Sequence, residues 1–163
     1  MSRIPADAEN RVSMEFSNRL AELIDEKKID FPDYNKSTLV KEAKVSKDIV
    51  NHALMFGIIP SLQPLIKMAN ALNVSLSYLL AESNDSHFYK SEFPKTFYER
   101  LEELKDEKGV KYSQIACKMP FAENFFYEWK RRNHLPSREY LKAIADYFGV
   151  TMDYLLGRTD DRN

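Results

Sequence analysis

The sequence predicts an all-α protein with two tandem five-helix domains. Apolar residues recur at the three- and four-residue spacing of amphipathic helices, and no run alternates in the manner of a β-strand. Two blocks of sequence also occur twice. Of the 163 residues, 44% are hydrophobic and 30% are charged, a composition typical of globular domains. This length suits one domain or two small ones.

An internal repeat divides the chain into two copies. One block returns at an offset of 81 residues with eight identities, and a second block returns at an offset of 76. The first copy therefore has five more residues between its blocks. We place this insertion at residues 30–35, where Pro32 and Asp33 indicate a loop. The paired blocks are residues 16–29 with 97–110, and residues 60–80 with 136–156.

The repeat also sets the expected domain boundaries. Residues 1–12 are polar without periodicity, which predicts a flexible tail. The first domain is expected over residues 13–81 and the second over residues 96–163. Between them, residues 82–95 have the polar start and the proline near the end that are typical of a linker. Two cores this small lead us to expect contact between the copies or between chains.

Capping residues predict the helix boundaries. In the second copy, Thr96 and Glu99 form a capping box at the start of the first helix, and Gly109 ends it. The second and third helices fall within residues 115–136. Pro136 begins the fourth helix, and Thr151 and Gly157 bound the fifth. In the first copy the helices are expected at residues 16–28, 36–44, 46–57, 61–72 and 75–81.

Residues 115–136 are predicted to form two short helices joined by a tight break. Met119 lies before the break on an apolar stripe, and Phe126 and Trp129 continue such a stripe after it. Helices this short must bury their stripes on a common core. The adjacent Phe125 and Phe126 cannot both face that core, so one of them is expected at the surface.

Charge is distributed unevenly along a chain of net charge −1. Residues 86–163 hold 14 Lys and Arg against 13 Asp and Glu, so this half is not strongly basic. Residues 111–138, in contrast, hold six basic residues against two acidic ones, a local excess of four positive charges. A negatively charged partner is expected at this surface.

Residues for catalysis are not apparent: there is no Gly-rich phosphate loop, no Ser/His/Asp arrangement and no catalytic carboxylate pair. The His residues are isolated from one another and Cys117 has no second cysteine, so neither a metal, a cofactor nor a disulfide is expected. We also expect no membrane span and no signal peptide. These features predict a cytoplasmic protein that is not an enzyme and has no small-molecule substrate.

Several motifs point to a family. The first helix of the second copy has the pattern F-x-x-R-L-x-x-L, Pro136 follows Ala116 by twenty residues, and the copy ends in V-T-x-D-Y-L-L-G-R-T-D from Val150. Val40 and Pro60 keep the twenty-residue spacing in the first copy. These motifs resemble the phage-repressor-like (xenobiotic-response-element) helix-turn-helix regulators. The resemblance implies a third helix in the major groove of DNA and a second helix that crosses the phosphates.

The resemblance also implies DNA-contacting residues at matched positions. Asn124 is the best candidate for reading a base, adenine, and the basic cluster after it is expected on phosphates. In the second copy the groove residues are Ala122, Glu123, Asn124, Tyr127 and Glu128, and the phosphate residues are Tyr112, Lys118, Lys130, Arg131 and Arg132. In the first copy they are Ser46, Lys47, Asp48, Asn51 and His52, with Lys36 on a phosphate.

The turn between the second and third helices departs from the family pattern. Lys44 and Pro120 stand where the family usually has glycine. Proline is held at a negative φ and cannot adopt a left-handed conformation, so the second copy is expected to turn differently.

The predicted function is sequence-specific binding of double-stranded DNA by a repressor-like transcriptional regulator. A homodimer and an intramolecular pseudo-dimer both remain open. The rival function is a protein-interaction module of the same fold without DNA binding, either antirepressor-like or a dimerisation partner. Near-neutral charge and an apolar turn in the first copy favour this rival, because apolar surface marks interfaces. The predicted contact residues are Leu54, Met55, Phe56, Ile58 and Ile59.

Overall fold

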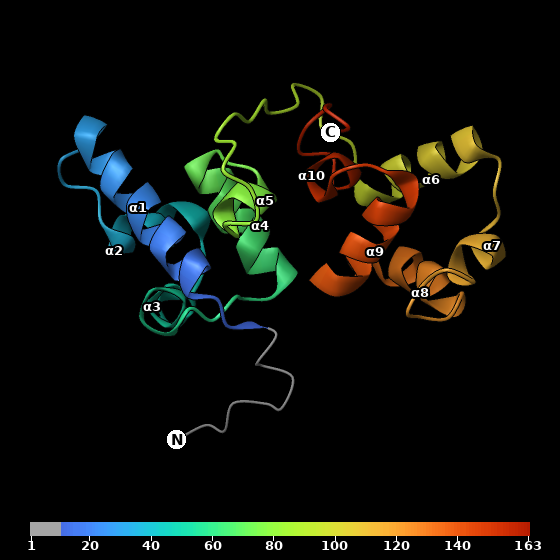
Figure 1. The fold of residues 1–163 in the computed structure, drawn as a ribbon, viewed down its shortest axis with the longest axis horizontal. Helices are drawn as coiled ribbons and strands as arrows, with labels where there is room; N and C mark the ends of the chain where they lie inside the picture. The colour runs from blue at the N-terminus through green and yellow to red at the C-terminus, as the bar shows by residue number, and fades with distance from the viewer. Residues whose placement is uncertain (1–10) are drawn as a thin grey trace, which may run out of the picture. The chain divides into compact units, whose positions relative to one another are not determined.

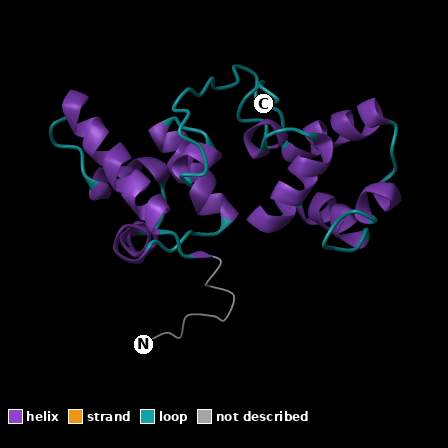
Figure 2. Ribbon diagram, viewed as in Figure 1, coloured by secondary structure: helices purple, strands orange, loops and turns teal. Residues whose placement is uncertain are grey.

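A computed structural model describes residues 11–163 of the chain. Over these residues the chain divides into two compact units, the first ending at His87 and the second beginning at Phe88 (Figure 1). Helices and loops make up both units, and β-pairing in the described residues is limited to two isolated bridges (Figure 2). The predicted all-α class is therefore confirmed. None of the helices described combines the length and apolar character needed to cross a membrane.

The first unit packs its helices in two crossing pairs. α1 lies against α3 and α5, and α2 lies against α3 and α4, around the buried Phe16, Leu39 and Leu65. The helix bounds differ from those predicted by at most two residues at either end. The helices are α1 (Met14–Asp30), α2 (Lys36–Ala43), α3 (Lys47–Phe56), α4 (Leu62–Leu72) and α5 (Leu76–Leu79).

The second unit is built around aliphatic and aromatic side chains. α10 packs on α6 and α9, and Trp129 is only 7% exposed at the centre of an aromatic cluster. Phe126 is buried at 3% exposure and its neighbour Phe125 is 38% exposed, as expected for adjacent helical residues. The helices are α6 (Phe97–Lys108), α7 (Tyr112–Ala116), α8 (Asn124–Arg132), α9 (Arg138–Phe148) and α10 (Met152–Leu155).

Repeated sequence adopts repeated local structure. The guanidinium of Arg19 lies 4.0 Å from the ring centre of Tyr78, and that of Arg100 lies 4.2 Å from the ring centre of Tyr154. These residues occupy matched positions of the two copies. Left-handed backbone also recurs at matched positions, in the pairs Gly57 and Asn133, Asn73 and Gly149, and Ala81 and Gly157.

The turn after the second helix differs between the units, as Pro120 predicts. In the first unit Lys44 is left-handed, with φ of 57°, and only residues 44–46 separate α2 from α3. In the second unit α7 ends at Ala116, the capping residue Cys117 has φ of −58°, and residues 117–123 separate α7 from α8. The tight break expected within residues 115–136 is therefore not formed, whereas the short turn expected between the helices at 36–44 and 46–57 is present.

The predicted linker is divided between the two units. On the first unit, Arg19 donates hydrogen bonds to the Ser83 carbonyl and to Asn84. On the second unit, the Ser91 amide donates to the Arg158 carbonyl at 2.9 Å, and the Thr159 hydroxyl donates to the Tyr89 carbonyl at 2.7 Å. Residues 88–95 of the predicted linker are thus part of the second unit.

The end of the predicted tail is also paired. Val12 forms an isolated bridge with Ile58, and the Ile59 amide donates to the Arg11 carbonyl at 2.6 Å. Arg11 and Val12 therefore belong to the first unit, because the turn after α3 satisfies their backbone groups. The rest of the predicted tail lies outside the described residues.

Candidate nucleic-acid interfaces

In the first unit only residues 44–46 join α2 to α3, and a turn of three or four residues is one feature of helix-turn-helix motifs. Asn35 caps α2 through a capping box that includes Thr38. Ser46 caps α3, since its hydroxyl accepts a hydrogen bond from the Ile49 amide at 3.3 Å. These caps satisfy amides that would otherwise lack partners at the start of each helix.

The start of α3 presents polar side chains to solvent. Ser46, Lys47, Asp48 and His52 are exposed. Asn51 is an exception, because it is half-buried and its Oδ1 is enclosed without a hydrogen-bond partner in the described part of the chain. A bidentate contact to adenine needs both atoms of the amide group, and Asn51 does not present its Oδ1 to solvent in this conformation.

Exposed lysines surround the same helix pair. Lys36 begins α2, Lys41 lies in its last turn, Lys44 forms the turn and Lys47 begins α3. Within residues 11–163 none of these four ammonium groups forms an ion pair, and only Glu42 and Asp48 oppose them on these helices. Lys41 and Lys44 were not among the predicted contact residues. Lys41 lies just before the short turn and Lys44 lies within it.

Of the predicted groove residues of the second unit, three lie on α8 and two precede it. Ala122 and Glu123 precede the helix, and Asn124 is its exposed first residue. The Tyr127 hydroxyl donates to Glu123 Oε1 at 3.1 Å, and this hydrogen bond raises the pKa of Tyr127. Asn124 is therefore left as the polar side chain of this turn that is open to a partner.

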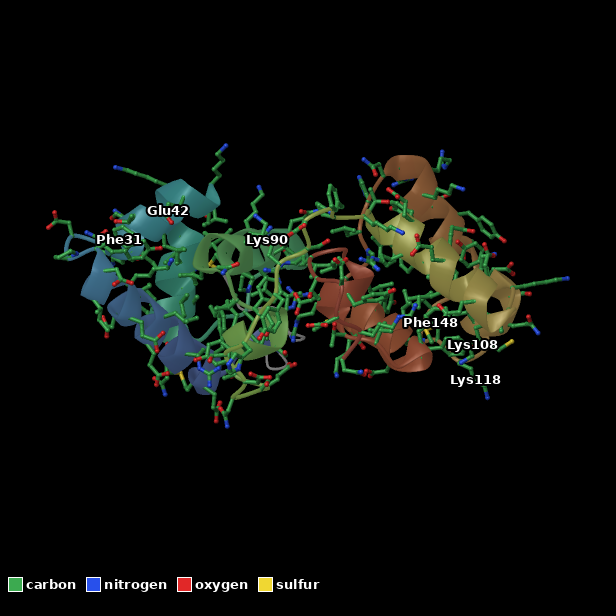
Figure 3. The ribbon with its side chains drawn as sticks, turned by 90° about the horizontal axis from the view of Figure 1, so that it is seen from above. Phe31, Glu42, Lys90, Lys108, Lys118 and Phe148 are labelled. Carbon is green, nitrogen blue, oxygen red and sulfur yellow. The ribbon has the colours of Figure 1, made fainter. Side chains whose placement is uncertain are left out.

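Glu128 holds two members of the basic cluster on the surface of α8. Its Oε2 lies 2.8 Å from Arg131 Nη2 and 3.2 Å from Arg132 Nε. The hydrogen bond from Arg131 lowers the pKa of Glu128, so the carboxylate is charged at neutral pH. Lys130 and Lys118 are exposed, and the Lys118 side chain lies on the outside of the second unit (Figure 3). The cluster keeps an excess of positive charge, reduced by one carboxylate.

The Tyr112 side chain, predicted to contact a phosphate, packs and hydrogen-bonds within the second unit. Its ring stacks on Phe126 with centroids 4.7 Å apart, and its hydroxyl donates to the Glu102 carboxylate. Burial and the hydrogen bond to Glu102 raise the pKa of Tyr112. The Tyr112 ring and hydroxyl are thus both engaged within the second unit, because the ring stacks on Phe126 of α8 and the hydroxyl bonds Glu102 of α6.

The predicted apolar contact surface is only partly exposed. Met55 and Phe56 are 66% and 54% exposed, whereas Leu54 and Ile58 are half-buried. Ile59, which is also among the predicted contact residues, is only 7% exposed. The backbone pairing with Arg11 turns Ile59 inward.

What the structure defines is an all-α protein with exposed cationic groups around two pairs of short helices. Comparison with known proteins gave no significant match among family models, curated proteins or solved structures.

Proposed function

We propose that this chain is a sequence-specific, double-stranded DNA-binding transcriptional regulator made of two tandem five-helix, repressor-like helix-turn-helix domains. The observation that carries the proposal is the α2–α3 pair, with its three-residue turn and four exposed lysines. Lysines at such positions neutralise phosphates, and a capped helix with a polar exposed start fits the major groove.

In the first unit, the proposed base-reading residues are Lys47, Asp48 and His52 at the start of α3. Lys can donate to guanine O6 and N7, and Asp can accept from cytosine N4. Lys36, Lys41 and Lys44 fix the position of the protein on the phosphates, a role that needs charge and reach but no defined geometry.

In the second unit, Asn124 is the proposed reader of adenine, since its amide can both donate and accept. Lys118, Lys130, Arg131 and Arg132 are the proposed phosphate contacts. Glu128 limits their strength, because phosphates must compete with its carboxylate for the two arginines. This competition should favour DNA sequences at which the base contacts of Asn124 are also made.

Fluorescence anisotropy with labelled duplex DNA tests the function. We expect log K to fall with log salt at a slope of about −6, because the seven proposed phosphate contacts each contribute about −0.9. The double variant Arg131→Ala and Arg132→Ala should weaken binding to all sequences and reduce the magnitude of the slope by about 2. Glu128→Gln should strengthen binding, since it releases both arginines.

Asn124→Ala is the matched control for specificity. It should cost about 1–3 kcal/mol on a duplex selected from a random pool and little on other duplexes. No binding at low salt, or a Glu128→Gln variant that binds more weakly than the parent, contradicts the proposal.

A protein-interaction role is the second candidate, and the exposure of Met55 and Phe56 favours it. Burying such side chains in an interface gains about 1.5–3 kcal/mol each. If this surface mediates association, Met55→Ser with Phe56→Ser should shift sedimentation toward the monomer. Phe93→Ser, which alters an 83% exposed aromatic elsewhere, should leave sedimentation unchanged. An unchanged mass for the double variant excludes this role for the surface.

A further inference from the structure

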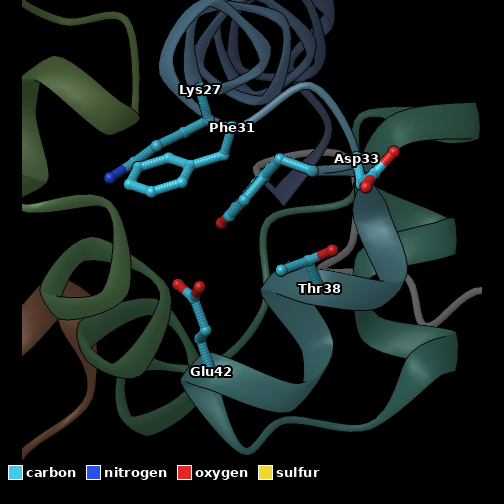
Figure 4. Close-up of a pocket in the computed structure, with 6 residues that line it drawn as sticks. Lys27, Phe31, Asp33, Thr38 and Glu42 are labelled. Atoms are coloured by element: carbon cyan, nitrogen blue, oxygen red, sulfur yellow. The ribbon is translucent and has the colours of Figure 1, made fainter.

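A pocket of about 240 Å³ lies in the first unit, at the junction of α1 and α2. Phe31 and Glu42 line it from opposite sides, and the Glu42 carboxylate points toward the Phe31 ring (Figure 4). Its other lining residues are Lys27, Asp33, Tyr34 and Thr38. The lining therefore combines aromatic rings with two carboxylates and one ammonium group.

Tyr34 is the unusual member of this lining. Its side chain is 5% exposed, yet its hydroxyl has no hydrogen-bond partner in the described part of the chain. A buried hydroxyl without a partner is destabilising, so such groups are commonly satisfied by a bound molecule. Burial and then the charge of Glu42 raise the pKa of Tyr34 to about 12, so the phenol is neutral at physiological pH.

The insertion that distinguishes the first copy from the second builds the pocket. Phe31, Asp33 and Tyr34 all come from residues 30–35, where the first copy has its five extra residues. Lys27 in α1, and Thr38 and Glu42 in α2, complete the wall. The second copy lacks these inserted residues, and Lys118 occupies the position that matches Glu42.

We infer that this pocket binds a small organic cation of the amidinium or ammonium class with a compact planar body. The cation lies between the Glu42 carboxylate and the face of Phe31, and one of its N–H groups donates to the Tyr34 oxygen. The pocket is separate from the proposed base-reading residues of α3 and does not depend on DNA binding.

Charge and shape select a cation over other ligands. Asp33 and Glu42 outnumber Lys27, and within the described residues Lys27 forms no ion pair with either carboxylate. Aromatic faces attract cations, and a carboxylate bonds N–H donors more strongly than a neutral acceptor does. An anion in the pocket would be attracted by Lys27 alone and repelled by the carboxylates of Asp33 and Glu42.

An NMR titration of the full chain with three probes of one shape tests the inference. Benzamidine is the cation, benzamide the neutral analogue and benzoate the anion. Benzamidine should give saturable shifts confined to residues 27–42, benzamide should bind at least about tenfold more weakly, and benzoate should give none. Absence of saturable benzamidine shifts, or equal shifts with benzoate, overturns the inference.

Single substitutions distinguish direct contact with benzamidine from the general effect of removing a negative charge. Glu42→Gln should weaken benzamidine binding about tenfold, and Tyr34→Phe should weaken it about threefold to tenfold. Glu26→Gln makes the same charge change on an exposed residue outside the pocket lining and should leave binding unchanged. Equal losses in Glu42→Gln and Glu26→Gln reject a specific site.

Tyr34→Phe also tests the hydroxyl without any ligand. Removing an unpartnered buried hydroxyl should raise the Tm of the free protein by a few degrees. A lower Tm means that the hydroxyl is already bonded in the free protein, which removes the argument for a missing ligand.

Discussion

Substituting Gly157 by alanine is expected to unfold much of the second unit. Gly157 has φ of +74°, and a Cβ at this position would lie 1.7 Å from the Lys95 carbonyl oxygen. That oxygen belongs to the backbone and cannot rotate away as a side chain would. We expect a loss of more than about 4 kcal/mol, in the range that only severe local conflicts reach.

Gly149→Ala is the matched control. Gly149 has φ of +67°, but a Cβ there meets no atom within 4 Å. Gly149→Ala should lower the free energy of unfolding by only about 1–2 kcal/mol, the cost of a left-handed conformation for alanine. Urea unfolding followed by fluorescence measures both variants, because Trp129 is the only tryptophan and reports on the second unit. Similar losses in the two variants contradict a steric role for Gly157.

The close approach of Gly157 to Lys95 is one of several contacts that attach residues 88–95 of the predicted linker to the second unit. Arg158 lies beside the Phe88 ring, 4.7 Å from its centre, and the Ser91 hydroxyl donates to Asp160 at 3.0 Å. The motif that ends the second copy therefore binds residues 88–95 through consecutive backbone and side-chain contacts. Residues 88–95 were predicted as part of a linker, and their pairing with residues 157–160 could not be predicted from neighbouring residues, because the hydrogen bonds join positions 69 and 70 residues apart.

Local signals predicted most of the helices. Caps such as Thr96 with Glu99, and stops such as Gly109, act within one turn and can be read from neighbours alone. Pro120 likewise predicted a different turn through its fixed φ. These features require no knowledge of distant residues.

The candidate site was harder to predict, because it depends on which partners a side chain finds. Tyr112 was expected on a phosphate, but Phe126 and Glu102 hold it inside the unit. Lys41 and Lys44 were not among the predicted contacts, because their exposure beside α3 is visible only in three dimensions. Tyr34 gave no signal at all, since an unpartnered hydroxyl is visible only in three dimensions.

The second large effect is expected at the buried ion pair of Asp153 and Arg158. Each side chain is 6% exposed, and Arg158 Nη1 donates to Asp153 Oδ1. Burial lowers the pKa of Arg158, while the charge and hydrogen bond of Asp153 oppose that shift. Asp153→Asn removes the opposing charge and should cost about 3–5 kcal/mol, because breaking a buried ion pair by removing one of its charges is strongly destabilising.

A double variant distinguishes the value of the pair from the cost of breaking it. Asp153→Leu with Arg158→Met replaces both charges by apolar groups, and such replacements are often neutral or stabilising. The first copy supports this expectation, since Ser77 and Glu82 occupy the matched positions and form no such pair. Urea unfolding should therefore show the double variant to be more stable than Asp153→Asn. A double variant as unstable as the single one, or an Asp153→Asn loss below about 1 kcal/mol, contradicts a desolvated Arg158.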